Sequence, residues 1–168
     1  PVYAADLERP VPNSPPVTRR ALWAFCAAQE FTLISPEFHE AFLFQYQRPI
    51  FEAYGHVHYG CCEDLTRKIN LLRKIPNLRR IAVSPVANVA KCAEQIGTDY
   101  ILSYRPSPAE MVSSGFQPDY IYKKLKEDFA VMKSNGCHFD ITLKDVETVQ
   151  NDDSRIKKFV EIARESIL

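Results

Sequence analysis

Residues 79–106 read RRIAVSPVANVAKCAEQIGTDYILSYRP, and this stretch decides the fold. The segment Arg80–Ser84 is rich in β-branched and small apolar residues and stops at Pro85, which is typical of a short buried strand. The segment Asn88–Ile96 has a helical pattern, with Gly97 at its C-terminal end. A second short strand is predicted at Tyr100–Ser103. A strand, a helix and a strand in this order predict a right-handed βαβ unit with parallel strands.

The same alternation continues outward in both directions. Ser35-Pro36-Glu37 combines a capping serine, a proline at the first helical position and an acid in the first turn, so a helix is expected from there to about Tyr54. The other expected helices are Glu63–Arg73, Pro118–Lys133 and Asp153–Ile167, and the other expected strands are Val57–Cys61 and His138–Leu143, with a strand-like run at Phe31–Ile34. The fold class is therefore α/β, with four parallel strands near Val57, Ile81, Ile101 and Ile141 covered by helices.

Composition excludes several classes of protein. The chain has 168 residues, 46% of them hydrophobic, and its 21 basic residues balance 21 acidic ones. It lacks the net positive charge of a nucleic-acid-binding domain and any apolar run long enough for a membrane span. Glycine-rich phosphate-binding motifs are also absent. An odd number of cysteines, 5, favours free thiols, and the cytoplasm is the expected compartment. We expect residues 1–22 to be an extended connecting segment and the chain to be part of a longer one.

Several short motifs occur in one order along the chain. They are Gln29-Glu30, Ser35-Pro36-Glu37-Phe38, Tyr46-Gln47-Arg48-Pro49-Ile50, His58-Tyr59-Gly60-Cys61-Cys62-Glu63, Asn77-Leu78-Arg79-Arg80, Val83-Ser84-Pro85, and Leu143-Lys144-Asp145 with Thr148. Together they resemble the C-terminal half of the uroporphyrinogen decarboxylase-like superfamily, which also holds cobalamin-dependent methyltransferases. The resemblance covers residues 23–168 and is greatest to an uncharacterised branch with Tyr-Gly-Cys-Cys-Glu.

The resemblance implies a fold and an activity. It implies a (β/α)8 barrel of the TIM type, of which a complete copy needs about 250 residues, so this chain would hold roughly the last four strands. It also implies a methyltransferase-type enzyme acting on a methylated small molecule or on a corrinoid carried by a partner protein. The chain alone is then expected to be inactive. The alternatives are a non-catalytic fragment or small-molecule-binding module and, less well matched, a tetrapyrrole decarboxylase.

In such a barrel the chemistry collects at the C-terminal ends of the strands. By this rule the predicted catalytic residues are His58, Glu63, Lys144 and Asp145. The predicted substrate-binding residues are Ser84, Tyr104 and Arg105. Cys92, Cys137 and His138 lie in a helix or at the opposite end of a strand and are expected to be structural, and His56 is expected to be solvated.

The two adjacent cysteines allow more than one role. With His58 and Glu30, the thiols of Cys61 and Cys62 would form a sulfur and nitrogen ligand set suited to zinc. The methyltransferase relatives use a His-x-Cys pair and a late cysteine, whereas this chain has Gly60 at the position of the first cysteine and Lys144-Asp145 at that of the second. A metal-free polar site and simple packing of small side chains therefore stay open.

Two further expectations concern surfaces. The stripe Phe38, Phe42, Tyr46, Pro49 and Ile50 has helical spacing and is predicted to be core. A half barrel would expose two sheet edges, so we expect a homodimer, the missing barrel half as a partner, or coverage by Pro1 to Phe31. Neither nucleic acid nor a membrane is an expected partner.

Overall fold

The computed structural model describes residues 17–168. Its helical elements are the short turns η1 (Arg19–Ala21) and η2 (Gln29–Phe31), α2 (Pro36–His39), the π-helical turn η3 (Glu40–Phe44), α3 (Gln45–Ala53), α4 (Ile69–Leu72), α5 (Val89–Ile96), α6 (Pro108–Met111), α7 (Pro118–Ser134) and α8 (Ser154–Ile167). The strands are β1 (Trp23–Cys26), β2 (His56–Tyr59), β3 (Leu78–Val83), β4 (Ile101–Tyr104) and β5 (His138–Ile141).

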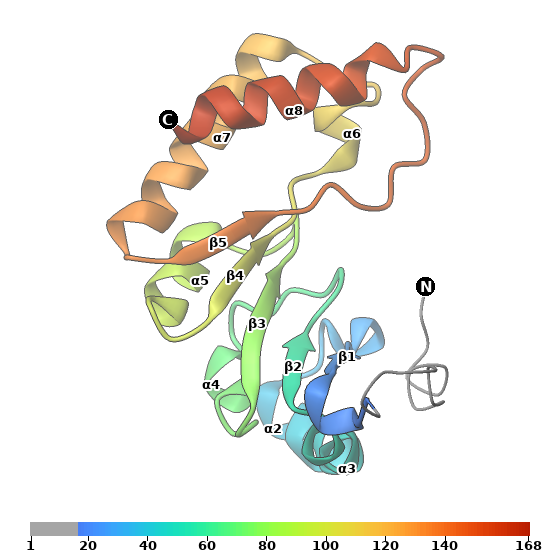
Figure 1. Cartoon of the computed structure of the whole chain (residues 1–168), viewed down its shortest axis with the longest axis vertical. Coiled ribbons are helices and arrows are strands. Elements are labelled where there is room, and N and C mark those ends of the chain that lie inside the picture. The colour runs from blue at the N-terminus through green and yellow to red at the C-terminus, as the bar shows by residue number, and fades with distance from the viewer. Residues whose placement is uncertain (1–16) are drawn as a thin grey trace.

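These strands form one sheet in the order β1-β2-β3-β4-β5, and every neighbouring pair is parallel (Figure 1). The prediction of four parallel strands, each leading to a helix, is confirmed, with β1 as an additional strand at one edge. Sequential order and parallel pairing are the arrangement of part of an α/β barrel. All the C-terminal ends of the strands consequently meet at one edge of the sheet.

Local sequence signals set the helix ends. Ser35 caps α2, because its Oγ accepts a hydrogen bond from the backbone N–H of Phe38 at 3.3 Å. Asn88 caps α5 in the same way, accepting from the N–H of Lys91 at 2.9 Å. The predicted starts of both helices are therefore confirmed.

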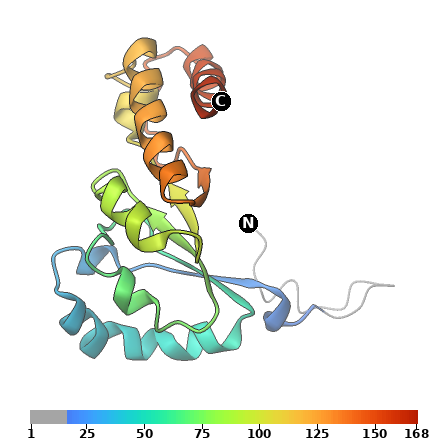
Figure 2. The same cartoon turned by 90° about the vertical axis from the view of Figure 1, so that its left-hand side faces the viewer.

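Helices α5 and α7 cover one face of the sheet, and α8 packs against α7 (Figure 2). The core between the layers includes Val57, Ile81 and Leu102 from the strands and Leu125 and Phe129 from α7, each at most 1% exposed. On the other face Trp23 and Phe25 of β1 are 47% and 59% exposed. One face of the sheet is thus a packed core, and the other is open over β1.

Two predicted elements are wrong. Phe31–Ile34 is not a strand: Phe31 ends the turn η2 and the first strand lies earlier, at β1. The helix predicted over Glu63–Arg73 contracts to α4, because residues 61–68 form turns held by side chains, among them Asp64, whose Oδ1 accepts the Thr66 N–H at 2.8 Å. The second error falls where polar contacts outcompete a weak local pattern.

The predicted aromatic core stripe is also wrong. Phe38, Phe42 and Tyr46 are 60%, 64% and 70% exposed, Ile50 is 46% exposed, and Pro49 is exposed as well. The buried residues of this helical segment are His39, Phe44 and Phe51. The cause is the π-helical turn η3, in which residues five apart lie on one face, so that His39 and Phe44 are both buried. A pattern of strict α-helical spacing selects the opposite face.

Three smaller points complete the fold. Residues 1–16, most of the predicted connecting segment, lie outside the described residues, and β1 begins at Trp23. Cys92 is buried in α5, and Cys137 and His138 lie at the start of β5, away from the C-terminal edge, as expected. No helix among residues 17–168 is long and apolar enough to cross a membrane.

Candidate functional site

A tight turn after β2 presents the two adjacent cysteines. Gly60 has φ +100°, and a Cβ atom there would lie 2.5 Å from Cδ1 of Leu65 and 3.1 Å from Cβ of Ala82. Its N–H donates to the carbonyl of Cys26 at the end of β1, at 2.7 Å. Only glycine satisfies this backbone and this space. The turn therefore fixes Cys61 at the C-terminal edge of the sheet.

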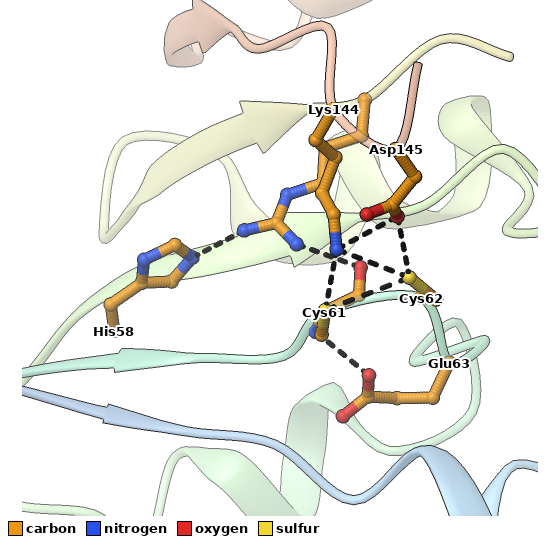
Figure 3. A network of polar contacts seen from close by, with 7 residues as sticks. His58, Cys61, Cys62, Glu63, Lys144 and Asp145 are labelled. Atoms are coloured by element: carbon orange, nitrogen blue, oxygen red, sulfur yellow. Dashed lines mark hydrogen bonds and ion pairs between the residues drawn. The ribbon is translucent and has the colours of Figure 1, made fainter. Parts of the chain in front are cut away.

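The thiols lie beside a cation and an anion from the loop after β5 (Figure 3). The Nζ of Lys144 lies 2.7 Å from Sγ of Cys61 and 3.2 Å from Sγ of Cys62. The Cys62 thiol donates to Oδ2 of Asp145 at 3.2 Å, and the same oxygen lies 2.9 Å from the Lys144 ammonium. The two sulfur atoms are 3.6 Å apart. We call these four residues the thiol cluster.

Electrostatics gives the two thiols different roles. Burial lowers the pKa of Lys144, but the hydrogen bonds to Cys61, Asp145 and Cys62 raise it by more, so this pKa lies above its ordinary value. Hydrogen bonds from Lys144 and then Cys62 lower the pKa of Asp145. Burial, followed by the bond to Asp145, raises the pKa of the Cys62 thiol. At neutral pH Lys144 is a cation and Asp145 an anion, and Cys62 is a protonated donor to Asp145, while the ammonium donates to both sulfur atoms and lies nearer to that of Cys61.

The backbone at Asp145 is unusual. This residue has φ 58°, a left-handed conformation that costs a residue other than glycine about 1 kcal/mol or more. It belongs to the segment 142–153, which has no helix or strand. A strained residue that bonds to a thiol and to a neighbouring ammonium is a feature that accompanies functional sites.

Glu63 holds the cysteine turn through hydrogen bonds that its carboxylate accepts from backbone N–H groups. It is 1% exposed, and its two carboxylate oxygens accept the backbone N–H groups of Ala28 and Cys61, both at 2.7 Å. In Figure 3 its side chain extends toward Cys61, where a carboxylate oxygen meets the backbone N–H. The residue predicted to be catalytic is thus placed to position Cys61, and it joins the end of β1 to the turn after β2.

Arg105 braces the same turn from the open face. It is 6% exposed, and its Nη1 donates to the carbonyl of Cys61 at 2.8 Å while its Nη2 lies 3.2 Å from Nε2 of His58. Burial, followed by the charges of Arg105 and Arg80, lowers the pKa of His58 to about 4. A neutral His58 accepts the guanidinium hydrogen bond.

The remaining predicted site residues lie apart from the sulfur atoms. Ser84 is buried and donates to the carbonyl of Glu63 at 3.0 Å. Tyr104 donates to the carboxylate of Asp128 on α7, on the helix-covered face. Glu30 is exposed in η2. The structure therefore brings together Lys144, Asp145 and the two thiols, braced by Arg105 and Glu63.

The arrangement bears directly on the predicted zinc site. Within residues 17–168 no three His, Cys, Asp or Glu side chains converge in a way that could hold a metal ion. The ammonium of Lys144 lies against both sulfur atoms, and His58 faces a guanidinium. A cation beside Cys61, Cys62 and His58 opposes the binding of a second cation there. The zinc hypothesis gains no support from this geometry and stays a prediction.

Sequence reasoning missed two polar groups. On the open face Arg80 pairs with Asp140, which also accepts from Ser103 at 3.1 Å. The only sequence signal is a charged residue inside each of two strands, on the same face. Behind the sheet the buried His39 ring lies 2.9 Å from the Tyr59 hydroxyl, which lies 2.9 Å from Oε1 of Gln47. His39 and Gln47 lie in the helical run 36–53 and Tyr59 lies in β2, so no local spacing rule links all three residues.

Comparisons with protein-family models, with curated proteins and with solved structures found no match to this chain. The resemblance to the uroporphyrinogen decarboxylase-like superfamily accordingly stays a prediction carried by the motifs alone.

Proposed function

We propose that this chain contributes the thiol cluster to a methyltransferase-type barrel, in which Cys61 accepts a methyl group from a methylated small molecule or a corrinoid. The observation that supports the proposal is the ammonium of Lys144 at 2.7 Å from Sγ of Cys61. A thiolate is the nucleophilic form of cysteine, and an adjacent cation stabilises it. In this proposal the ammonium does for the thiolate what zinc does in the methyltransferase relatives.

The transfer balances without a metal. The lone pair of the Cys61 thiolate attacks the methyl carbon, a sulfur–carbon bond forms, and the bond from the methyl group to the donor breaks. The donor leaves with the electron pair. Lys144 stays protonated throughout, so it provides charge and position rather than a proton. Because Cys61 is only 8% exposed, the site admits a small group such as methyl to the sulfur.

The other residues position these two groups. Asp145 holds the ammonium at 2.9 Å and takes the Cys62 hydrogen bond, which keeps Cys62 protonated beside Cys61. Glu63 and Arg105 fix the backbone N–H and carbonyl of Cys61. Lys144, Glu63 and Arg105 thus act on Cys61 from three separate segments, which is the preorganisation that a nucleophile needs.

The test is the methylation rate of each thiol in the purified chain. Methyl 4-nitrobenzenesulfonate serves as a small donor, and mass spectrometry of peptides gives the rate at each of the five cysteines. Cys61 is expected to react fastest, and Cys26 and Cys92 slowest, because burial raises the pKa of each of the latter two to about 11. Turnover is then sought in the complete barrel with methylcobalamin as donor.

Lys144→Met is the decisive variant. Loss of the ammonium should slow methylation of Cys61 by about tenfold to hundredfold, the effect of removing one close opposite charge. Lys157→Met, on the exposed face of α8, is the matched control and should leave the rate unchanged. Equal rates at Cys61 and Cys92, or no effect of Lys144→Met, would favour the alternative of a non-catalytic small-molecule-binding module. Zinc bound at Cys61 in the purified protein would instead restore the metal hypothesis.

A further inference from the structure

The cysteines at 61 and 62 differ from the other three in their surroundings. Their sulfur atoms are 3.6 Å apart at an edge where Cys62 is partly exposed. Cys26, Cys92 and Cys137 are buried, and none of the three has another cysteine among its hydrogen-bond partners. Two thiols of one turn therefore stand within reach of each other, and one of them, Cys62, is also within reach of solvent.

We propose that Cys61 and Cys62 form a reversible redox pair that hydrogen peroxide oxidises to a disulfide. This role does not rest on methyl transfer, since it requires only the two thiols and the cation beside them. The sulfur atoms need to approach from 3.6 Å to about 2.05 Å. Rotation of the partly exposed Cys62 side chain supplies that movement.

The oxidation proceeds in two steps. The Cys61 thiolate attacks one oxygen of the peroxide, the oxygen–oxygen bond breaks, and hydroxide leaves and takes a proton to become water. Cys61 is then a sulfenic acid. The Cys62 thiol passes its proton to Asp145 or to solvent and attacks the Cys61 sulfur, and the hydroxyl group leaves as a second water. The two thiols lose two electrons and two protons, and one peroxide becomes two waters.

The geometry also makes the disulfide easy to reduce. Neighbouring Cα atoms are about 3.8 Å apart, whereas disulfides usually join Cα atoms about 4.4–6.8 Å apart. A disulfide between residues 61 and 62 is consequently strained, and strain favours reduction. A reversible switch rather than a structural bridge follows from this.

Oxidation would act on the loop that carries Lys144 and Asp145. A disulfide weakens the Cys61 sulfur as an acceptor for Lys144 and removes the S–H group that donates to Asp145. These contacts join the segment 142–153 to the turn after β2, and Asp145 is held there in a strained conformation. The oxidised chain should therefore hold this segment less firmly.

The experiment exposes the purified chain to hydrogen peroxide and maps the cysteines by mass spectrometry. The peptide with both residues should lose two hydrogen masses and regain them with dithiothreitol. In Cys62→Ser the reaction should stop at a sulfenic acid on Cys61 that dimedone traps, whereas Cys92→Ser should still form the disulfide. Disulfides only between molecules, oxidation spread evenly over all five thiols, or no change in the peptide would overturn the proposal.

A second measurement uses hydrogen exchange. Amides of residues 142–153 should exchange faster in the oxidised chain, while those of α7 should not change. Unchanged exchange in 142–153 after complete disulfide formation would overturn the coupling to the loop. Cys61 could still fail to accept a methyl group in the separate methylation assay, so the two proposals stand or fall independently.

Discussion

Replacing Glu63 by glutamine tests the claim that one buried carboxylate joins β1 to the cysteine turn. The side chain is 1% exposed and accepts two backbone N–H groups, each at 2.7 Å. Glutamine keeps one acceptor oxygen and places an NH2 group against the other donor. Burial lowers the pKa of the buried Lys68, and the negative charges of Glu63 and Asp64 oppose this shift. Glu63→Gln removes one of these two compensating charges.

The magnitude follows from these contacts. A hydrogen bond to a charged group contributes about 1.5–3 kcal/mol, and an unsatisfied buried donor costs a further 1–3 kcal/mol or so. Since glutamine retains one bond and loses the other, the two contributions add to an expected loss for Glu63→Gln of about 2.5–6 kcal/mol of unfolding free energy. A domain has only about 5–15 kcal/mol in total, so the variant should remain folded but be clearly weakened.

Urea denaturation gives the unfolding free energy, and hydrogen exchange reports on the amides of Ala28 and Cys61. Both amides should exchange faster in Glu63→Gln, and methylation of Cys61 should slow in the folded protein because its turn is less fixed. Glu94→Gln, on the exposed face of α5, is the matched control and should change stability by less than about 0.5 kcal/mol. A loss below about 1 kcal/mol for Glu63→Gln, with unchanged exchange at both amides, would refute the reasoning.

Three further outcomes are expected. Burial, as the largest cause, lowers the pKa of both His39 and His58 to about 4, below the value of about 6.5 in an unfolded chain. The unfolded state therefore binds more protons, and the unfolding free energy should fall as the pH falls from about 6.5 towards 4. Equal urea midpoints at pH 7 and pH 5 would contradict this. Phe44→Ala should cost about 3–5 kcal/mol, because Phe44 is 7% exposed, whereas Phe42→Ala should cost less than about 1 kcal/mol; similar thermal shifts for the two would show that the buried face is misassigned. Gly60→Ala should cost at least about 2 kcal/mol through its positive φ and the contact with Leu65, and a variant as stable as the parent in urea would disprove the need for glycine.

The sequence by itself determined the layout of the chain. The alternation of short β-rich runs with capped helices predicted parallel strands, and the strands near Val57, Ile81, Ile101 and Ile141 are all present. The cap at Ser35 and the start of a helix at Asn88 were predicted because these signals depend on residues within one turn. Backbone preferences and short-range hydrogen bonds depend on neighbouring residues, so they can be predicted from a single sequence.

The edge of the sheet at which the site lies was also predicted from the sequence. Parallel strands align their C-terminal ends, so Cys61, Arg105 and Lys144 had to fall at one edge once the strands were known. Their contacts could not be predicted. The ammonium of Lys144 meets thiols 83 and 82 residues away, and Glu63 bonds to an amide 35 residues away.

Only the tertiary structure decided which face of a helix is buried and what each polar side chain touches. Phe38 and Phe42 have the spacing of a core stripe, yet the π-helical turn at Glu40–Phe44 brings His39 and Phe44 to the buried face instead. Glu63 and Lys144 looked alike as polar residues at the mouth, but one is a buried brace and the other a cation beside a thiol. Burial and pairing depend on residues distant in sequence packing together, and the free energy of that packing outweighs the weak local preference for either face.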